Sequence, residues 1–155
     1  MNKWLKLAVC ILIPLSAGWI GSIFTTSSVG SWYLSINKPL FNPPSWVFGP
    51  VWTTLFILMG ISLYLIVKNG IAKKNKAAVF AFGFQITLNI LWSFLFFGMH
   101  SPGAAFIEII VLWAAILANI ILFYKISKKA AYLLMPYILW VSFAAVLNYS
   151  IWMLN

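Results

Sequence analysis

The residues of this chain that could perform acid–base or nucleophilic chemistry are few. The sequence holds one histidine, one cysteine and one acidic residue, Glu108, and it contains no aspartate. A Ser-His-Asp triad, a pair of catalytic carboxylates or a cysteine metal cluster would need more such side chains than the chain has. We therefore expect no metal site, no resident cofactor and no hydrolytic chemistry. His100 is interpreted as a turn residue rather than a haem ligand, and Cys10 as a small packing residue.

Tryptophan is the residue type that stands out, with nine among 155 residues. Residues three and four apart are neighbours on a helix, so helical spacing would gather several aromatic side chains on shared faces. Indole-rich faces of this kind can stack on a flat apolar ligand. The three groups are Phe48, Trp52 and Phe56; Gln85, Asn89, Trp92 and Phe96; and Tyr137, Trp140, Ala144 and Asn148.

The composition indicates that helices inside a membrane position these faces. Hydrophobic residues make up 64% of the chain and charged residues only 7%, against about 25% charged residues in soluble domains. A transmembrane β-barrel would show alternating polarity, whereas residues 107–122 are apolar on every face. The first apolar run is long enough to span a membrane, so we expect a retained helix rather than a cleaved signal peptide. We predict an all-α membrane protein with one transmembrane domain over residues 1–155, a five-transmembrane-helix bundle with helices at about 7–27, 46–67, 77–97, 104–124 and 130–153.

The ten lysines support this number of helices and set an orientation. With five spans, nine of the ten lie on the side of the N-terminus, and only Lys38 lies on the other. Positive residues gather on the cytoplasmic side of membrane proteins, so the N-terminus is expected in the cytoplasm. The net charge of +9 does not indicate nucleic-acid binding, because the lysines form short clusters between spans and no basic stripe. We expect membrane lipid, and no nucleic acid, among the partners.

Polar side chains within the spans have two possible roles. Amides avoid lipid and should face the bundle interior, where they either join helices around a packed core or add polarity to an indole-walled cavity. Glu108, about one to two turns into its helix, either binds a ligand or a proton, or makes a structural pair near the membrane surface. The spacing leaves both alternatives open in each case. The amides are Gln85, Asn89, Asn119 and Asn148.

The polar run at residues 25–31 is expected to end the first helix, and a stretch rich in proline and aromatic residues follows it. Pro39, Pro43 and Pro44 stiffen this loop, and a rigid aromatic loop can cover one mouth of a helix bundle. Residues 32–53 read WYLSINKPLFNPPSWVFGPVWT, and the later motifs are LNILWSFLFFG at 88–98, PYILW at 136–140 and LNYSIW at 147–152. Together they resemble the translocator protein family, formerly the peripheral-type benzodiazepine receptors, whose bacterial members are tryptophan-rich sensory proteins. The resemblance covers essentially the whole chain.

The resemblance implies a five-helix bundle that binds porphyrin-type tetrapyrroles and benzodiazepine-type ligands under the first loop. Animal members carry a basic residue after the final tyrosine that completes a proposed cholesterol motif; here Ser150 follows Tyr149, so the motif is incomplete. We favour a bacterial cytoplasmic membrane as the location. The positions that match the family's pocket are Trp46, Phe48, Trp52, Asn89, Trp92, Trp140, Phe143, Ala144 and Leu147.

The resemblance also implies a homodimer. Small residues at four-residue spacing let helices approach closely, and the pair Ala77 and Ala81 marks the expected seam. Two further pairs are Ala17 with Gly21 and Ala114 with Ala118.

Three functions remain open from the sequence. The first is a binding protein or sensor, in which a porphyrin stacks on Trp52 and Trp140 above a floor of Asn89 and Trp92. The second is an enzyme that degrades bound porphyrin under light, with Trp52 and Trp140 as the oxidisable indoles. The third is a transporter of the same ligand, although the spans lack the paired charges of proton-coupled transport.

Overall fold

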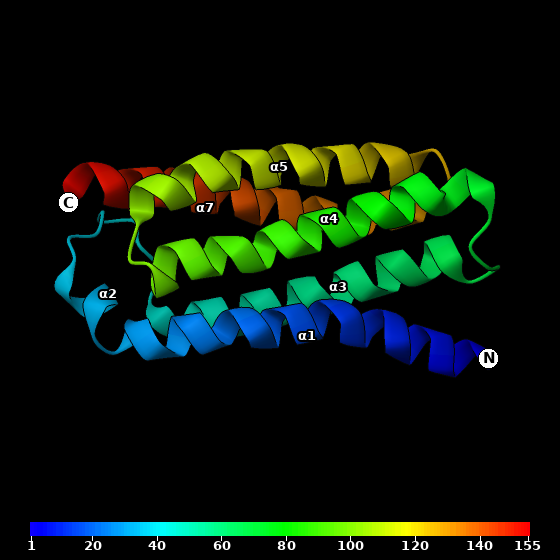
Figure 1. Ribbon diagram of the computed structural model, residues 1–155, viewed down its shortest axis with the longest axis horizontal. Helices are drawn as coiled ribbons and strands as arrows, with labels where there is room; N and C mark the ends of the chain where they lie inside the picture. Colours follow the sequence, from blue (N-terminus) through cyan, green and yellow to red (C-terminus); the bar gives the residue numbers. More distant parts are fainter.

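The computed structural model describes all 155 residues, and every regular element in it is helical (Figure 1). Five helical segments are long and apolar enough to cross a membrane, which confirms the predicted all-α fold with five spans. The chain termini lie at opposite ends of the bundle (Figure 1), called here the N-terminal and C-terminal ends. The spans are α1 (Lys3–Val29); η1 (Ser45–Val47) with α3 (Phe48–Val67); η2 (Lys73–Asn75), α4 (Lys76–Ser93) and the π-helical turn η3 (Phe94–Gly98); α5 (Pro102–Tyr124); and α6 (Lys128–Leu133) with α7 (Met135–Leu154).

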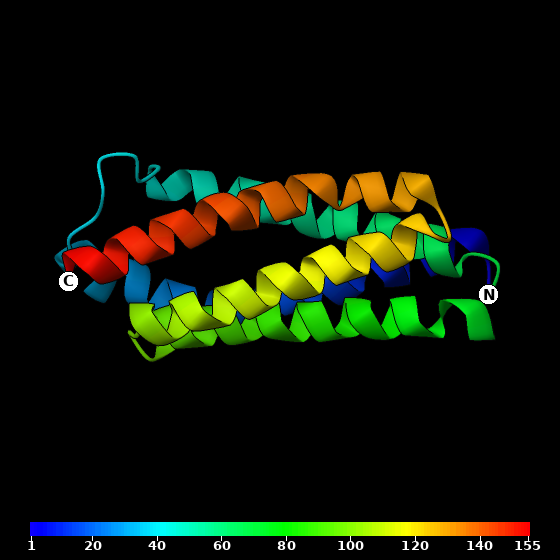
Figure 2. The same ribbon diagram turned by 90° about the horizontal axis from the view of Figure 1, so that it is seen from above.

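The spans pack as one bundle in which α1 contacts both α3 and α4, while α5 contacts α4 and α7. At the N-terminal end α6 packs against α3 as well as α5, which closes the bundle there. Towards the C-terminal end the backbones of α3 and α7 stay farther apart, as the two views together show (Figures 1 and 2). Aromatic side chains bridge this gap, Phe48 against Trp140 with ring centroids 6.0 Å apart and Trp52 against Tyr137 at 6.3 Å.

The first span differs from its predicted bounds of 7–27. It begins at Lys3, where Asn2 accepts a hydrogen bond from the Trp4 backbone N–H at 3.2 Å. It also continues through the run of hydroxyl residues that was expected to stop it. Thr25 donates to Gly21 O at 3.2 Å, and the next hydroxyl residues bond in the same way to carbonyls of their own helix. These local bonds occupy the side chains without breaking the helix.

The last span is not the single helix predicted over 130–153. It starts at Lys128, one residue after Ser127, whose Oγ accepts from the Ala130 N–H at 3.3 Å. The helix then breaks at Leu134, between α6 and α7. Pro136 follows the break and has no N–H to donate to the preceding turn, which explains the interruption.

The core is densest near the N-terminal end. Phe82 of α4 stacks on Phe123 of α5, with ring centroids 6.1 Å apart and planes 8° from parallel. On α3, Gly60 touches α1 so closely that a Cβ atom there would lie 2.4 Å from the Ile11 Cα. Small residues permit such backbone contacts between membrane helices. Here Ala17 and Gly21 are buried inside the chain, which places that pair away from any partner molecule.

Candidate functional site

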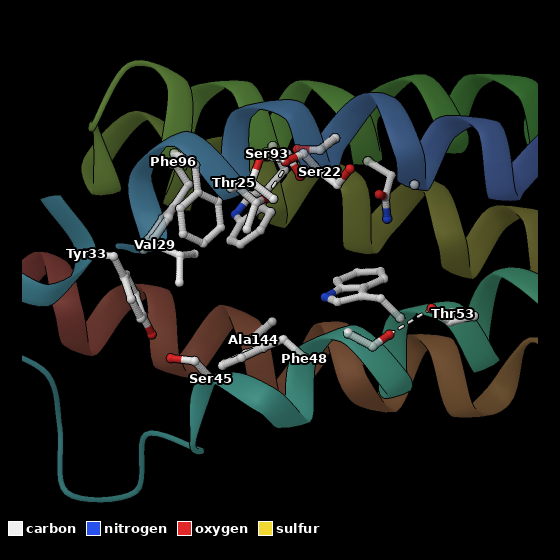
Figure 3. A pocket seen from close by; sticks show the side chains of 18 of the residues that line it. Ser22, Thr25, Val29, Tyr33, Ser45, Phe48, Thr53, Ser93, Phe96 and Ala144 are labelled. Carbon is white, nitrogen blue, oxygen red and sulfur yellow. Dashed lines mark hydrogen bonds between the residues drawn. The ribbon is translucent and has the colours of Figure 1, made fainter. Parts of the chain in front are cut away.

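A cavity of about 620 Å³ lies in the C-terminal half of the bundle. Its size falls within the range of about 300–1,000 Å³ that small-molecule sites occupy. Side chains of α1, α3, α4, η3 and α7 line it, whereas α5 contributes none. Figure 3 shows Thr25 and Phe96 on one side of the space and Phe48 and Ala144 on the other. Tyr33, from the short helix α2 (Trp32–Ser35), closes the end beneath the loop.

Trp92 forms a fixed part of the cavity wall. Its Nε1 donates to Asn148 Oδ1 at 2.9 Å, and its ring stacks on Phe96 with centroids 5.2 Å apart. The Asn148 Nδ2 donates in turn to Pro102 O at 2.8 Å, which joins α7 to the first turn of α5. This indole is therefore held in place from both its polar and its apolar sides.

Trp52 and Trp140 belong to α3 and α7, the two helices that separate at this end of the bundle. The Trp52 ring stacks on Phe56, with centroids 5.5 Å apart, and Trp140 meets the edge of Phe48. The Nε1 of Trp140 is buried and has no hydrogen-bond partner. The aromatic surfaces of these two residues thus form much of the wall that a ligand would contact.

The cavity is uncharged and offers few free polar groups. No lysine, histidine, cysteine or glutamate is among the residues that line it. The hydroxyl groups of Ser22, Thr25 and Thr53 donate to carbonyls of their own helices, at 2.7, 3.2 and 2.9 Å. The Asn89 amide donates to the Tyr137 hydroxyl at 2.9 Å. Such a lining holds a ligand by shape and ring stacking rather than by ionic contacts.

The loop between α2 and α3 crosses the C-terminal end and is tied down at several points (Figure 2). The Tyr33 hydroxyl donates to Asn42 Oδ1 at 2.9 Å. Lys38 Nζ donates to the Tyr33 and Ile36 carbonyls and lies 4.8 Å from the centre of the Tyr33 ring. Burial raises the pKa of the Tyr33 phenol, which keeps its hydroxyl a donor at neutral pH. The loop is therefore fastened to the C-terminal end of the bundle beside Tyr33, which lines the cavity.

Most of the residues expected to contact a ligand lie together around this cavity. Leu147 adds an apolar side chain and Ala144 leaves open space one helical turn beyond Trp140. Asn89 and Asn148 line the cavity and also make hydrogen bonds between helices, so the two interpretations of the amides both apply. The seven residues that the structure brings together are Phe48, Trp52, Asn89, Trp92, Trp140, Ala144 and Leu147.

Trp46 and Phe143 do not line the cavity, so the structure does not bring them together with the other residues expected to contact a ligand. Trp46 is 74% exposed, because a 3-10 turn precedes α3 and the α-helix begins only at Phe48. The helical spacing that brings Phe48 and Trp52 to one face therefore does not extend back to Trp46. Phe143 packs behind Trp140, with ring centroids 5.4 Å apart, and against Phe41 of the loop.

The contribution of α1 was missed because its Trp19 was not grouped with the other aromatic faces, and most of its other lining residues are small or carry hydroxyl groups. The cavity is lined along α1 by Gly18, Ser22, Thr25 and Val29, which recur every three or four residues. That spacing marks one helical face. The interpretation of the hydroxyl run as a helix end concealed it.

Two further polar residues lie outside the cavity. The His100 Nε2 is 3.0 Å from Ser28 Oγ, and it is the donor, since Ser28 uses its own hydrogen to bond Phe97 O at 2.6 Å. The His100 ring stacks on Trp32 with centroids 4.5 Å apart. Glu108 is only 7% exposed, and neither of its oxygens has a hydrogen-bond partner. Glu108 lies one to two turns into α5, as expected, but it has none of the partners that a structural pair would need, because α5 turns its side chain into the bundle.

Comparison with known proteins agrees with this architecture. The family described as the TspO/MBR family matches residues 10–153. The chain is 46% identical to the tryptophan-rich protein TspO of Chlorobaculum tepidum, over 100% of this chain and 99% of the relative. It is 45% identical to the tryptophan-rich protein TspO of Archaeoglobus fulgidus, over 97% of each chain. It is 34% identical to the translocator protein of Homo sapiens, over 96% of this chain and 89% of that protein. The chain is therefore an integral membrane protein that belongs to the TspO/MBR family.

Proposed function

We propose that the protein binds porphyrin-type tetrapyrroles in the aromatic cavity, together with benzodiazepine-type ligands, and senses or handles them there. The observation that carries this proposal is an uncharged cavity of about 620 Å³ whose wall includes the indoles of Trp52, Trp92 and Trp140, one from each of α3, α4 and α7. A porphyrin is flat, apolar and polarisable, so it gains most from stacking on aromatic rings. Ala144 faces the open space (Figure 3) and leaves room for the edge of a macrocycle.

Titration of the purified protein with a free-base porphyrin, followed by quenching of tryptophan fluorescence, tests binding. Trp52→Phe and Trp140→Phe should each weaken affinity by about 1 kcal/mol, because phenylalanine keeps an aromatic face but is smaller than indole. Trp4→Phe is the matched control, since Trp4 is 65% exposed and lies at the opposite end of the bundle. An equal loss of affinity in all three variants would place the ligand outside the cavity.

Light-dependent oxidative degradation of the bound porphyrin is a second candidate function. It is favoured by the position of Trp140, whose indole ring lines the cavity where a bound macrocycle would lie. In this mechanism the macrocycle absorbs light, dioxygen is the oxidant, and an indole beside the ring relays an electron. Illumination of the porphyrin complex should then bleach the macrocycle, and either Trp52→Phe or Trp140→Phe should abolish bleaching while most of the affinity remains. Full bleaching in the double variant would remove both indoles from the mechanism.

The orientation proposed for the protein places the N-terminal end in the cytoplasm of a bacterial cell. Lys6 and Lys68 meet at that end, where Lys6 Nζ donates to the Lys68 carbonyl at 3.2 Å, and most other lysines share it. Cysteines introduced at Asn69 and Asn155 should be labelled from opposite sides of the membrane. Labelling of Asn69→Cys from the outer side only would reverse this orientation.

A further inference from the structure

Glu108 is the only side-chain carboxyl in the chain, and it lies in the interior of the bundle rather than at a surface. It is 7% exposed, and both of its oxygens lack a hydrogen-bond donor. No lysine is available to neutralise it there, because all ten lie outside the apolar cores of the spans. None of the residues of the cavity wall is ionic either. The surroundings of Glu108 therefore hold no compensating positive charge.

An unpaired carboxylate in such a place is strongly disfavoured. Transfer of an ion out of water costs several kcal/mol even after the protein relaxes around it. A neutral carboxylic acid avoids most of that cost. We propose that Glu108 is a proton-binding site inside the membrane, occupied at neutral pH, and that Tyr137 couples this proton to the ligand cavity. In the binding step a carboxylate oxygen takes a proton from a hydronium ion and releases water, with no change in oxidation state.

Two long helices, α4 and α7, pack against α5, which carries Glu108. Tyr137 of α7 is buried, with 1% of its surface exposed. Gln85 of α4 is fully buried, and its Nε2, a hydrogen-bond donor, has no partner. Asn89 of α4 donates to the Tyr137 hydroxyl. Glu108 and Tyr137 are the only buried titratable side chains of α4, α5 and α7, so a proton gained or lost in this interior belongs to one of the two.

The Tyr137 hydroxyl is the link between this interior and the cavity. It donates its single hydrogen to Gln85 Oε1 at 2.8 Å and accepts from Asn89 Nδ2 at 2.9 Å. Asn89 lines the cavity, as does Trp52, whose ring meets the edge of the Tyr137 ring. A negative charge on Glu108 would reorient the dipoles of this buried network, because the low dielectric of the interior strengthens such interactions. Rotation of that hydroxyl would disturb two residues of the cavity wall.

The presence of the proton can be measured directly by infrared spectroscopy, because the chain has one side-chain carboxyl. The intact protein, in a detergent without carbonyl groups, should show at neutral pH a protonated-carboxyl stretch that shifts in D₂O. Glu108→Gln should lack this band, and it is nearly isosteric, so the fold should persist. If the Glu108→Gln substitution instead removes a carboxylate band from the wild-type spectrum, Glu108 is ionised at neutral pH and the proposed proton-binding site does not exist.

Coupling to the cavity rests on the proposed function and needs a separate experiment. A porphyrin with only alkyl side chains should bind the wild type with an affinity that changes by about threefold or more as Glu108 ionises at alkaline pH. Glu108→Gln should show no such change. Tyr137→Phe should keep the infrared band and lose the pH dependence of binding. The same pH dependence in wild type and Glu108→Gln would overturn the coupling, whereas no binding by any variant would refute the proposed function and leave the infrared result standing.

Discussion

The two halves of the bundle contain the same five spans but pack in opposite ways. In the N-terminal half, Gly60 brings α3 into backbone contact with α1 at Ile11. The Ser62 hydroxyl of α3 also donates to the Ala130 carbonyl of α6 at 2.6 Å. In the C-terminal half, α3 and α7 stay apart, and the rings of Phe48 and Trp140 hold the space between them. The N-terminal half is closed, and the C-terminal half encloses the cavity.

This comparison of the two halves indicates that the size of the side chains between the helices determines where the bundle contains a cavity. Without a hydrophobic driving force between helices in lipid, close contact depends on small residues and interhelical hydrogen bonds. The closed half has both. The C-terminal half also has interhelical hydrogen bonds, but there the facing side chains of α3 and α7 are aromatic rings that keep the two helices apart. One half supplies stability and the other supplies a site.

The largest expected effect is a loss of stability in the closed half. Gly60→Ala places a methyl group 2.4 Å from the Ile11 Cα, and backbone atoms cannot move aside cheaply. We expect a loss of about 3 kcal/mol in the free energy of unfolding, measured by denaturation of the purified protein in detergent. Gly83→Ala is the matched control, since nothing lies within 4 Å of its Cβ, and alanine there should be neutral or slightly stabilising. Equal stability of the two variants would show that α1 and α3 are not in contact at Gly60.

A smaller loss is expected from removal of the amide that fixes the cavity wall. Asn148→Leu leaves the Trp92 Nε1 without an acceptor and the Pro102 carbonyl without a donor. A buried group left unpaired costs about 1–3 kcal/mol, so unfolding should become easier by about 2 kcal/mol. Asn119→Leu in the closed half is the comparison, because that amide makes one long bond of 3.4 Å to Ala78. If Asn119→Leu costs more than Asn148→Leu, the amide bonds of the C-terminal half are not what holds its wall.

Which half of the bundle is closed and which encloses the cavity could not be predicted from the sequence. The number of spans and the aromatic faces follow from hydropathy, lysine positions and helical spacing, because these depend on local sequence. Gln85 and Asn119 are buried inside the bundle, as predicted from the cost of exposing amides to lipid. Whether the aromatic faces enclose space depends on contacts between residues far apart in the chain, such as Gly60 with Ile11.

The errors have local causes that hydropathy does not reveal. The hydroxyl run at the end of α1 appeared too polar for a helix, but side chains such as Thr25 bond back to their own helix. Trp46 was assigned to the cavity by its place in a motif, yet it lies in a 3-10 turn and faces outward. For Glu108 the sequence predicts the depth along the helix but not the direction of the side chain, which points into the bundle. Side-chain direction at these positions is set by packing partners.

The loop between α2 and α3 at the C-terminal end should contribute less free energy than the two helix contacts at Gly60 and Asn148. Tyr33→Phe removes one hydrogen bond, from the Tyr33 hydroxyl to Asn42, which is worth about 1 kcal/mol. Porphyrin should therefore dissociate a few times faster, as measured by stopped-flow fluorescence. Tyr132→Phe serves as the control, because Tyr132 is exposed at the closed end. An unchanged dissociation rate in Tyr33→Phe would mean that the ligand does not leave past the loop.

The smallest expected effect on folding concerns the outer surface of the closed half. Ala77 and Ala81 line a shallow groove there with Phe80 and Phe84, and we propose that this groove is the seam of a homodimer. Ala81→Leu should leave the monomer folded and reduce cross-linking between protomers, because a larger side chain prevents close approach. Gly83→Ala, on the same helix but outside the groove, should cross-link normally. A dimer of unchanged mass in Ala81→Leu would move the seam to another surface.

The most direct test of the account fills the cavity without touching the closed half. Ala144→Phe adds a ring to open space between the helices (Figure 3). Ala114→Phe, at an exposed position on α5 outside the cavity, is the matched control. Porphyrin titration of both variants should show affinity lowered by about 30-fold or more, about 2 kcal/mol, in Ala144→Phe and unchanged in Ala114→Phe, with both proteins folded. Wild-type affinity in a folded Ala144→Phe variant would contradict the assignment of the ligand to this cavity.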